Sequence, residues 1–345
     1  MLIALLVLTL TLSGLFLWAA GGIQRPRHFE GEIVDQAPVV GLPAAPATEK
    51  LTIMTWNMAY ARGPNPDNTK NDPDPKEVVE RRLKEMGALI RSKKVDVLLL
   101  QEVDFDAARS HRIDQIAKLA EASGLRYTAR AVTWRANYVP YPYWPPSRHY
   151  GRVLSGGAVL SRYPIRANLV TLHPKPKRHA WYYNLFYLFR FTQRVRLAVG
   201  QKQLWVVNNH LEAFDKENRA EQAQALVGLL HALPTEDPLL VVGGDLNTTP
   251  PEAQKKHGFP DEPEDDYRED ETLPILRKLS ALRELVTPEE YRANEGAFFT
   301  FPSEAPTRRL DYLFASTRAA VLRREFPATR DFSDHRPVIA ELKLP

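Results

Sequence analysis

Hydrophobic and polar residues alternate with two different periods along the chain from residue 51 onward. Apolar residues recur every three or four positions between Val79 and Ile90, which predicts an amphipathic helix over Lys76–Ser92. The same period predicts helices over Ile113–Ser123, ended by Gly124, and over Arg219–Leu233. Short continuous apolar runs are typical of buried strands. The predicted strands are Leu51–Asn57, Val95–Asp104, Gly156–Ile165, Leu204–Phe214, Pro238–Pro250, Leu310–Ser316 and Arg336–Leu344.

This succession of strands and helices has no internal repeat. It predicts a mixed α and β domain over residues 51–345, with long sheets that carry helices on their outer faces.

The N-terminal segment, residues 1–22, has no charged side chain, and Leu2–Ala20 is almost wholly apolar. About 20 such residues are enough to cross a bilayer, so the segment is either a retained membrane anchor or a signal peptide. Small residues at Ala19–Gly22 offer a loose cleavage site, whereas Arg25 and Arg27 would hold that flank in the cytoplasm by the positive-inside rule. We expect a membrane-associated protein, or an exported one if the segment is cleaved, and the side of the membrane stays open.

Residues 23–50 have the composition of a tether. The stretch VDQAPVVGLPAAPATEK is rich in Pro and Ala and shows neither a helical nor a strand period. Such a composition is typical of a semi-extended spacer, after which the folded domain is expected to start at Leu51.

Composition restricts the chemistry. Hydrophobic residues make up 44% of the 345 residues and charged residues 26%, as in ordinary globular proteins, and the formal net charge is +4. There is no cysteine, which excludes disulfides, thiolate metal sites and cysteine nucleophiles. Any metal must therefore be held by oxygen and imidazole ligands, which favours magnesium, manganese or calcium.

Several predicted strands end in a carboxylate, an amide or an imidazole. A single polar residue at a strand end is more often structural than catalytic. This domain has many strand ends with residues that can bind a metal or transfer a proton. If the strands belong to two packed sheets, these residues indicate a shared pocket. The residues concerned are Asn57, Glu102, His210, Asp245, Asn247, Asp311, Asp334 and His335.

Seven motifs at these strand ends carry a family resemblance. In chain order they are TWN, LLQEVD, GGAVLSRYPI, VVNNHLEA, GGDLNTTP, RLDYLFAS and FSDHRPV. From about Leu51 to Leu344 the chain resembles the endonuclease/exonuclease/phosphatase superfamily. The resemblance implies a four-layered α/β sandwich, with two mixed β-sheets packed face to face and helices outside. It also implies a hydrolase that cleaves phosphoesters with the help of a metal.

The resemblance assigns expected roles. Hydrolysis of a phosphodiester requires a cation on the phosphate oxygens and an activated water. Glu102 is the expected metal ligand, helped by Asn57 and Asp334, and the expected ion is Mg²⁺, with Mn²⁺ as an alternative.

The expected catalytic residues are Asp245 and Asn247, which position the attacking water and the phosphate, the pair His335 and Asp311, and His210. Whether Asp245 or His335 takes the proton stays open at this stage. The expected phosphate-binding residues are Asn208, Asn247, His210 and His335.

The substrate is less defined. Two stretches, Trp134–Gly151 and His173–Arg194, interleave aromatic rings with basic residues. Such stretches form platforms for single-stranded nucleic acid, lie at membrane interfaces, or simply pack on the core. The acidic stretch Asp261–Glu271 is expected to be a solvated loop.

LQEVD, followed by Arg109, Ser110 and Asp114, is similar to bacterial proteins grouped with neutral sphingomyelinases and GPI-anchor lipid remodelling factors. We therefore expect a monomeric, membrane-associated phosphodiesterase that acts on lipid-linked or small phosphodiesters. The alternatives are an exported endonuclease or exonuclease on DNA or RNA, and a catalytically inactive, membrane-tethered binding module.

Overall fold

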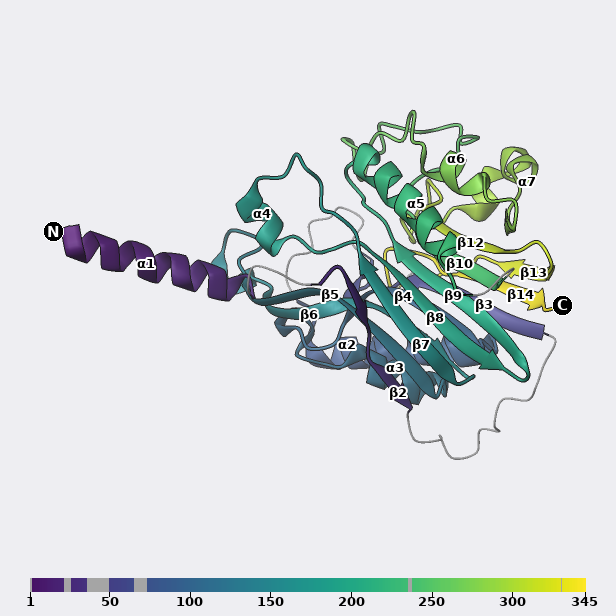
Figure 1. Cartoon of the computed structure of the whole chain (residues 1–345), viewed down its shortest axis with the longest axis horizontal. Coiled ribbons are helices and arrows are strands. Elements are labelled where there is room, and N and C mark those ends of the chain that lie inside the picture. Colours follow the sequence, from purple (N-terminus) through teal and green to yellow (C-terminus); the bar gives the residue numbers. More distant parts are fainter. Residues whose placement is uncertain (1, 22–25, 36–49, 65–72, 235–237, 330) are drawn as a thin grey trace.

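Two seven-stranded sheets form the centre of the computed structural model, which describes residues 2–21, 26–35, 50–64, 73–234, 238–329 and 331–345 (Figure 1). From one edge of the first sheet to the other, the strands are β1 (His28–Glu30), β7 (Ile165–Leu172), β8 (Phe191–Val199), β9 (Lys202–His210), β10 (Leu239–Asp245), β12 (Asp311–Ser316) and β11 (Leu282–Glu284). The second sheet runs β13 (Ala320–Glu325), β14 (Val338–Lys343), β3 (Lys50–Asn57), β4 (Val97–Asp104), β6 (Gly151–Ser161), β5 (Tyr127–Val139) and β2 (Ile33–Asp35).

Helices cover the outer faces of both sheets. The α-helices are α1 (Leu2–Ala19), α2 (Lys76–Ser92), α3 (Gln115–Ser123), α4 (Trp181–Phe186), α5 (Lys216–His231), α6 (Thr272–Arg277) and α7 (Pro288–Ala293). Short 3₁₀ turns lie at η1 (Ala59–Ala61), η2 (Ala108–Ser110), η3 (Pro146–Arg148) and η4 (Glu295–Phe298). In Figure 1, α2 and α3 lie on one side of the paired sheets and α5 and α6 on the other. The predicted α/β sandwich of two mixed sheets is confirmed.

The central strands are buried on both faces, and this explains their continuous apolar sequences. Ile53 of β3 points between the sheets and packs in one cluster with Val206 of β9. Its neighbour Met54 points the other way, into a cluster that contains Leu83 of α2 and Ile116 of α3. Successive side chains of a strand point to opposite faces, so a strand that is covered on both sides needs apolar residues at every position.

Residues 28–35 correct the expectation for the tether. β1 pairs with β7 in the first sheet, and β2 pairs with β5 in the second. Between them, Gly31 donates its backbone N–H to the Asn168 carbonyl oxygen, and Arg130 donates its backbone N–H to the Glu32 carbonyl oxygen. The expectation that residues 23–50 carry no strand is therefore wrong for this part, because these residues join the edges of both sheets. Residues 22–25 and 36–49 lie outside the described part of the chain.

The sheet topology places the polar strand ends at one rim of the sandwich. β3 and β4 run parallel, with Asn57 opposite Gln101. β9 and β10 also run parallel, and Asp245 lies opposite His210 on one side and opposite Asp311 of β12 on the other. The carboxyl ends of parallel strands share an edge, so the two sheets deliver their polar ends to a common rim.

Candidate active site

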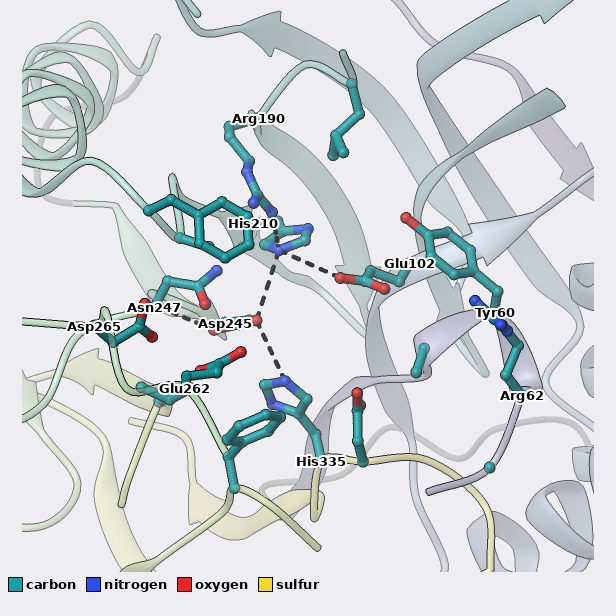
Figure 2. A pocket seen from close by; sticks show the side chains of 18 of the residues that line it. Tyr60, Arg62, Glu102, Arg190, His210, Asp245, Asn247, Glu262, Asp265 and His335 are labelled. Carbon is teal, nitrogen blue, oxygen red and sulfur yellow. Dashed lines mark hydrogen bonds and ion pairs between the residues drawn. The ribbon is translucent and has the colours of Figure 1, made fainter. Parts of the chain in front are cut away.

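A cavity of about 280 Å³ opens at this rim, between the ends of the two sheets (Figure 2). It gathers side chains from segments far apart in the sequence. Its charged and imidazole-bearing lining residues are Arg62, Glu102, Arg190, His210, Asp245, Glu262, Asp265, Asp334 and His335.

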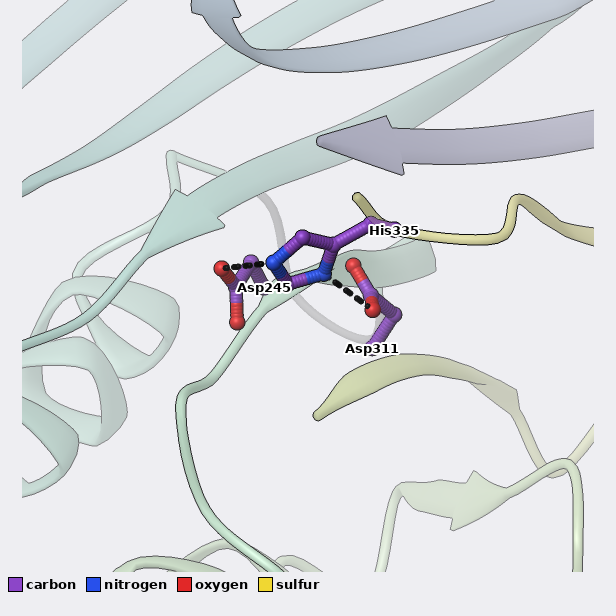
Figure 3. A group of neighbouring side chains, drawn as sticks. All are labelled: Asp245, Asp311 and His335. Atoms are coloured by element: carbon purple, nitrogen blue, oxygen red, sulfur yellow. Dashed lines mark hydrogen bonds and ion pairs between the residues drawn. The ribbon is translucent and has the colours of Figure 1, made fainter. Parts of the chain in front are cut away.

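His335 lies between two carboxylates (Figure 3). Its Nδ1 is 2.8 Å from Oδ2 of Asp311, and its Nε2 is 3.8 Å from Oδ2 of Asp245. Since a carboxylate only accepts, Nδ1 carries the proton that is donated to Asp311. The backbone is fixed as well, because the Trp56 indole N–H donates to the His335 carbonyl oxygen at 3.0 Å. The pairing of His335 with Asp311 that the sequence implied is present in the structure.

The carboxylates determine the charge of this imidazole. Burial alone would lower the pKa of His335, but the negative charges of Asp311 and Asp245 outweigh burial and raise this pKa to about 10. The ring is therefore an imidazolium at neutral pH, and its Nε2 side faces the cavity as a hydrogen-bond donor.

Asp245 ends β10 and lies at the centre of the cavity wall. Its Oδ2 accepts a hydrogen bond from Asn57 Nδ2 at 2.9 Å, and its Oδ1 accepts one from the backbone N–H of Asn247 at 2.9 Å. Burial raises the pKa of Asp245 to about 6, although the positive charge of His335 opposes that rise. A carboxylate with such a pKa is suited to take up a proton near neutral pH.

Glu102 reaches the cavity because β4 is irregular where it ends. The pairing of β4 with β6 shifts register between Leu100 and Val103, and Glu102 has a positive φ of 52°. A bulge of this kind turns a side chain away from its regular direction. The Glu102 side chain is 24% exposed, and its Oε1 accepts a hydrogen bond from Asn57 Nδ2 at 3.3 Å. Its pKa is raised, mainly by burial.

Glu102 and Asp334 fit a divalent cation. Burial raises the pKa of Asp334, the charge of His335 opposes this rise and the charge of Glu102 adds to it, which together brings this pKa to about 6. A divalent cation would stabilise the charged forms of both carboxylates. Both line the cavity, where an ion could keep water ligands and meet a substrate oxygen. Asn57 donates hydrogen bonds from Nδ2 to Glu102 and Asp245, and its Oδ1 accepts one from the backbone N–H of Ala59. Asn57 therefore orients these two carboxylates.

A second group of ligand type consists of Asp245, Asp311 and His335, whose ligand atoms lie within 4.8 Å of one another. Here the Nδ1 of His335 is already engaged by Asp311, and Asp311 is not among the residues that line the cavity. An ion at this position would displace a buried hydrogen bond. Glu102 and Asp334 both line the cavity and are the carboxylates that would hold a metal ion there.

Asn208 is the one expected phosphate-binding residue that does not reach the cavity. It is fully buried between the sheets, where its Nδ2 donates to the Leu100 carbonyl oxygen at 2.9 Å and its Oδ1 accepts from Gln101 Nε2 at 2.6 Å. In this structure its polar atoms join the two sheets. Asn247 does line the cavity, and its Nδ2 donates to the Leu211 carbonyl oxygen at 2.9 Å.

Arg190 is the main residue that the sequence did not indicate. It lies one residue before β8, is buried, and donates a hydrogen bond to Nε2 of His210. Burial and the positive charge of Arg190 lower the pKa of His210 well below its ordinary value, so His210 is neutral. Arg190 also lies 3.6 Å from Glu212, which balances its charge. An arginine inside an aromatic stretch carries no motif, so sequence gave no signal for this role.

The acidic stretch 261–271 is not the solvated loop that was expected. Arg308 forms an ion pair with Asp261 at 2.8 Å and another with Glu262. Arg219 binds Asp270 at 2.7 Å. These pairs hold the stretch against the domain and place Glu262 and Asp265 at the cavity wall. Two buried arginines distant in sequence provide the partners, which is why the local composition was misleading.

The α/β sandwich, and the carboxylates and imidazoles gathered at its rim, are typical of a hydrolase of phosphoesters. Residues 54–335 match the sequence profile of the Endonuclease/Exonuclease/phosphatase family, and the chain belongs to that family. A search of the curated proteins found no match.

Solved structures support the same fold. An endonuclease/exonuclease/phosphatase from Beutenbergia cavernae is 24% identical with a TM-score of 0.60, over 86% of this chain and 72% of that one. A mannosyl-6-phosphatase from Bacteroides thetaiotaomicron is 16% identical with a TM-score of 0.55, over 85% and 99%. TDP2 from D. rerio, complexed with a single strand DNA product, is 14% identical with a TM-score of 0.53, over 85% and 98%. At these identities the similarity shows the fold alone.

Proposed function

We propose that this protein is a Mg²⁺-dependent phosphodiesterase at a membrane surface, acting on lipid-linked or small phosphodiesters. The observation that carries the chemistry is the convergence of Glu102, Asp334, Asp245 and the imidazolium of His335 on one cavity. Hydrolysis of an anionic ester requires three kinds of group: carboxylates that hold a cation, a group that accepts a proton, and a positively charged hydrogen-bond donor.

In this proposal Glu102 and Asp334 would hold the ion, which would supply Lewis-acid stabilisation of charge on the phosphate oxygens. Asp245 accepts the proton of the attacking water, and the backbone N–H of Asn247 keeps this carboxylate in place. His335 donates from Nε2 to a phosphate oxygen while Asp311 fixes its tautomer.

His210 and Arg190 complete the wall on the side of the first sheet. The Arg190 guanidinium is held between His210 and Glu212 and brings a hydrogen-bond donor of the kind that binds phosphate to this wall. The neutral His210 lies 3.6 Å from Asp245 and 3.8 Å from Glu102.

Support for a membrane setting comes from α1. Its 18 residues have a mean hydropathy of 2.3 and none is buried, so the helix is long and apolar enough to cross a bilayer. A signal sequence has the same properties, so the helix alone is weak support. Exposed aromatic rings, at Trp144 and Trp181 with 80% and 71% exposure, are of the kind that lies at the level of lipid headgroups.

The runner-up is a nuclease, since TDP2 from D. rerio shares the fold and was solved with a single strand DNA product. Exposed aromatic rings also stack on unpaired bases.

The deciding experiment is a hydrolysis screen of the full-length protein in lipid nanodiscs, with Mg²⁺ and with excess EDTA. The substrates are sphingomyelin, phosphoinositides, single-stranded DNA, RNA, bis-p-nitrophenyl phosphate and the monoester p-nitrophenyl phosphate. We expect Mg²⁺-dependent turnover of diesters and preference for a lipid. Preference for an oligonucleotide would establish the nuclease, faster turnover of the monoester would make the protein a phosphatase, and no turnover would indicate an inactive binding module.

A further inference from the structure

A second cavity, of about 320 Å³, lies beside the active site and is lined by aromatic and aliphatic side chains. Phe16 of α1 forms one side of it. Phe186 of α4 packs against Phe16 with ring centroids 5.2 Å apart, and Tyr141 and Trp134 line it from the β5–β6 side. Figure 1 shows α4 next to the end of α1 that adjoins the domain. We call this the aromatic cavity.

The aromatic cavity adjoins the active-site cavity directly, because Leu188 lines both. The residue before it, Tyr187, donates a hydrogen bond to Oε1 of Glu212 at 2.8 Å. Oε2 of Glu212 lies 3.6 Å from Nε of Arg190, in the active site. These polar contacts of Tyr187, Glu212 and Arg190 fix the segment that separates the two cavities. Because the cavities are adjacent, one ligand could place an anionic group in the active-site cavity and an apolar group in the aromatic cavity.

The position of the aromatic cavity indicates where that apolar group comes from. It lies where α1 meets the domain, and α1 is apolar and exposed from Leu2 to Leu15. Trp181 contacts Phe16 with ring centroids 6.3 Å apart and is otherwise exposed, as is Trp144. If α1 is in a bilayer, these rings lie at its surface, and a hydrocarbon chain can pass from the bilayer to the aromatic cavity without crossing open water.

We propose that the aromatic cavity binds the hydrocarbon chain of a lipid phosphodiester whose phosphate lies against Glu102, Asp334 and His335. The inference rests on the proposed function and adds to it the apolar half of the substrate site. Each methylene that enters contributes about 0.8 kcal/mol, a factor of about four in affinity, until the cavity is full.

The test uses alkyl p-nitrophenyl phosphates from methyl to octyl with the full-length protein in nanodiscs and Mg²⁺. In the wild type, kcat/KM is expected to rise several-fold per added methylene over the first members. In Phe186→Ala the ratio of octyl to methyl turnover should fall at least tenfold. Leu322→Ala is the control, because Leu322 is exposed on β13 and belongs to neither cavity lining, and it should keep the wild-type ratio. Both variants are measured in the same nanodiscs, so partitioning of substrate into lipid cancels.

An octyl-to-methyl ratio that is the same in the wild type and in Phe186→Ala overturns the inference. Tyr141→Ala, at a position that is 47% exposed, gives the same comparison if Phe186→Ala does not fold. Calorimetric measurement of the binding of octyl phosphate and methyl phosphate separates failure of the proposed phosphodiesterase activity from failure of the aromatic-cavity inference. Tighter octyl binding that depends on Phe186, without hydrolysis of any diester, would contradict the proposed function and support the cavity. Hydrolysis of diesters without a preference for chain length would support the proposed function and contradict the role of the aromatic cavity.

Discussion

At the scale of single residues, Glu102 is held in a conformation that non-glycine residues rarely adopt. Its φ of 52° lies in the left-handed region, and Asn247, also in the cavity, has a φ of 51°. Such conformations cost about 1–3 kcal/mol and persist where surrounding structure enforces them. Here Asn57 holds Glu102 and Asp245 together. These two outliers are residues to which we assign chemistry, whereas others, such as Lys94 and Glu269, lie outside the cavity lining.

The first prediction follows from this position. Glu102→Gln keeps the shape of the side chain but removes one anionic ligand, so Mg²⁺ binding should weaken and turnover should fall at least a hundredfold. Calorimetric titration of Mg²⁺ and assays over a range of Mg²⁺ concentrations measure both effects. The thermal midpoint of the metal-free protein should not fall, because the variant removes a buried charge. A fully active Glu102→Gln protein would show that the metal lies elsewhere.

The second prediction concerns Asp311 and His335, which form one unit through their 2.8 Å contact. Asp311→Asn and His335→Ala should each lower kcat by two to four orders of magnitude. The double variant should be little slower than the slower single variant, because residues that act as a unit are non-additive. A double-mutant cycle on kcat measures this. Losses that multiply cleanly would mean that the two residues act independently.

The third prediction concerns pH. Burial raises the pKa values of Asp245 and Asp334 from 3.8 to about 6, so between pH 4 and 6 the folded metal-free protein binds more protons than the unfolded chain. Its free energy of unfolding should therefore fall as pH rises through this window, by roughly 3 kcal/mol per group at most. The raised pKa of His335 acts in the same direction but between pH 6.5 and 10.

Mg²⁺ binds the ionised carboxylates, so its stabilising effect should grow as pH rises through 6. Urea unfolding of EDTA-treated and Mg²⁺-loaded protein from pH 4.5 to 7.5 provides the measurement. Asp334→Asn is the control, and it should flatten the pH dependence of the metal-free protein. Stability of the metal-free wild type that rises between pH 4 and 6 would contradict the burial of these groups.

At the scale of elements, Gly31 makes residues 28–35 part of the fold. A Cβ atom there would collide with the Arg130 carbonyl oxygen and the Asn168 side-chain amide. Gly31→Ala should therefore destabilise the protein by about 1–3 kcal/mol. Gly228→Ala, in α5 with open space around it, should be neutral or slightly stabilising. Equal thermal midpoints for the two variants would indicate that residues 28–35 do not pack on the sheets.

The elements that the sequence predicted well are those with a strong local signal. α2 begins and ends where its apolar period predicted, and α3 has the expected C-terminal Gly124 with φ of 79° together with an Asp114 side chain that caps its first turn. The strand ends that carry Asn57 and Asp245 were also predicted, because buried apolar runs stop there, and Asp311 begins β12.

Elements with weak local signals were missed. β8 has arginines at Arg194 and Arg196 on its half-buried face, so its sequence does not resemble a central strand. β1 and β2 have three residues each and form only because Gly31 lets the chain lie against both sheet edges. Glu262 is held at the cavity by an ion pair with the distant Arg308, and Asp265 lines the same cavity. Contacts of this kind depend on the tertiary fold and leave no periodic pattern in the sequence.

At the scale of the whole molecule, α1 projects from the end of the domain at which α4 lies, opposite the C-terminus (Figure 1). Trp144 and Trp181 are exposed at this end, and the aromatic cavity lies between α1 and the active site. A bilayer that accommodates α1 would thus lie next to the site rather than on the far side of the protein. The same surface would be the stacking platform if the substrate were a nucleic acid.

The last prediction separates these possibilities. Replacing Trp144 and Trp181 with Ala in the full-length protein should lower hydrolysis of a vesicle-embedded lipid phosphodiester by about threefold to tenfold, because interfacial rings hold the domain against the headgroups. Turnover of bis-p-nitrophenyl phosphate should stay unchanged, since neither ring lines the active-site cavity. Tyr163→Phe, a change at a buried position remote from this surface, serves as the control. A nuclease would respond differently: the two tryptophan replacements would weaken binding to single-stranded oligonucleotides, measured by fluorescence anisotropy, and leave lipid hydrolysis unaffected. If neither measurement changes, the exposed rings contact no substrate-bearing surface, and the lipid assignment loses this support.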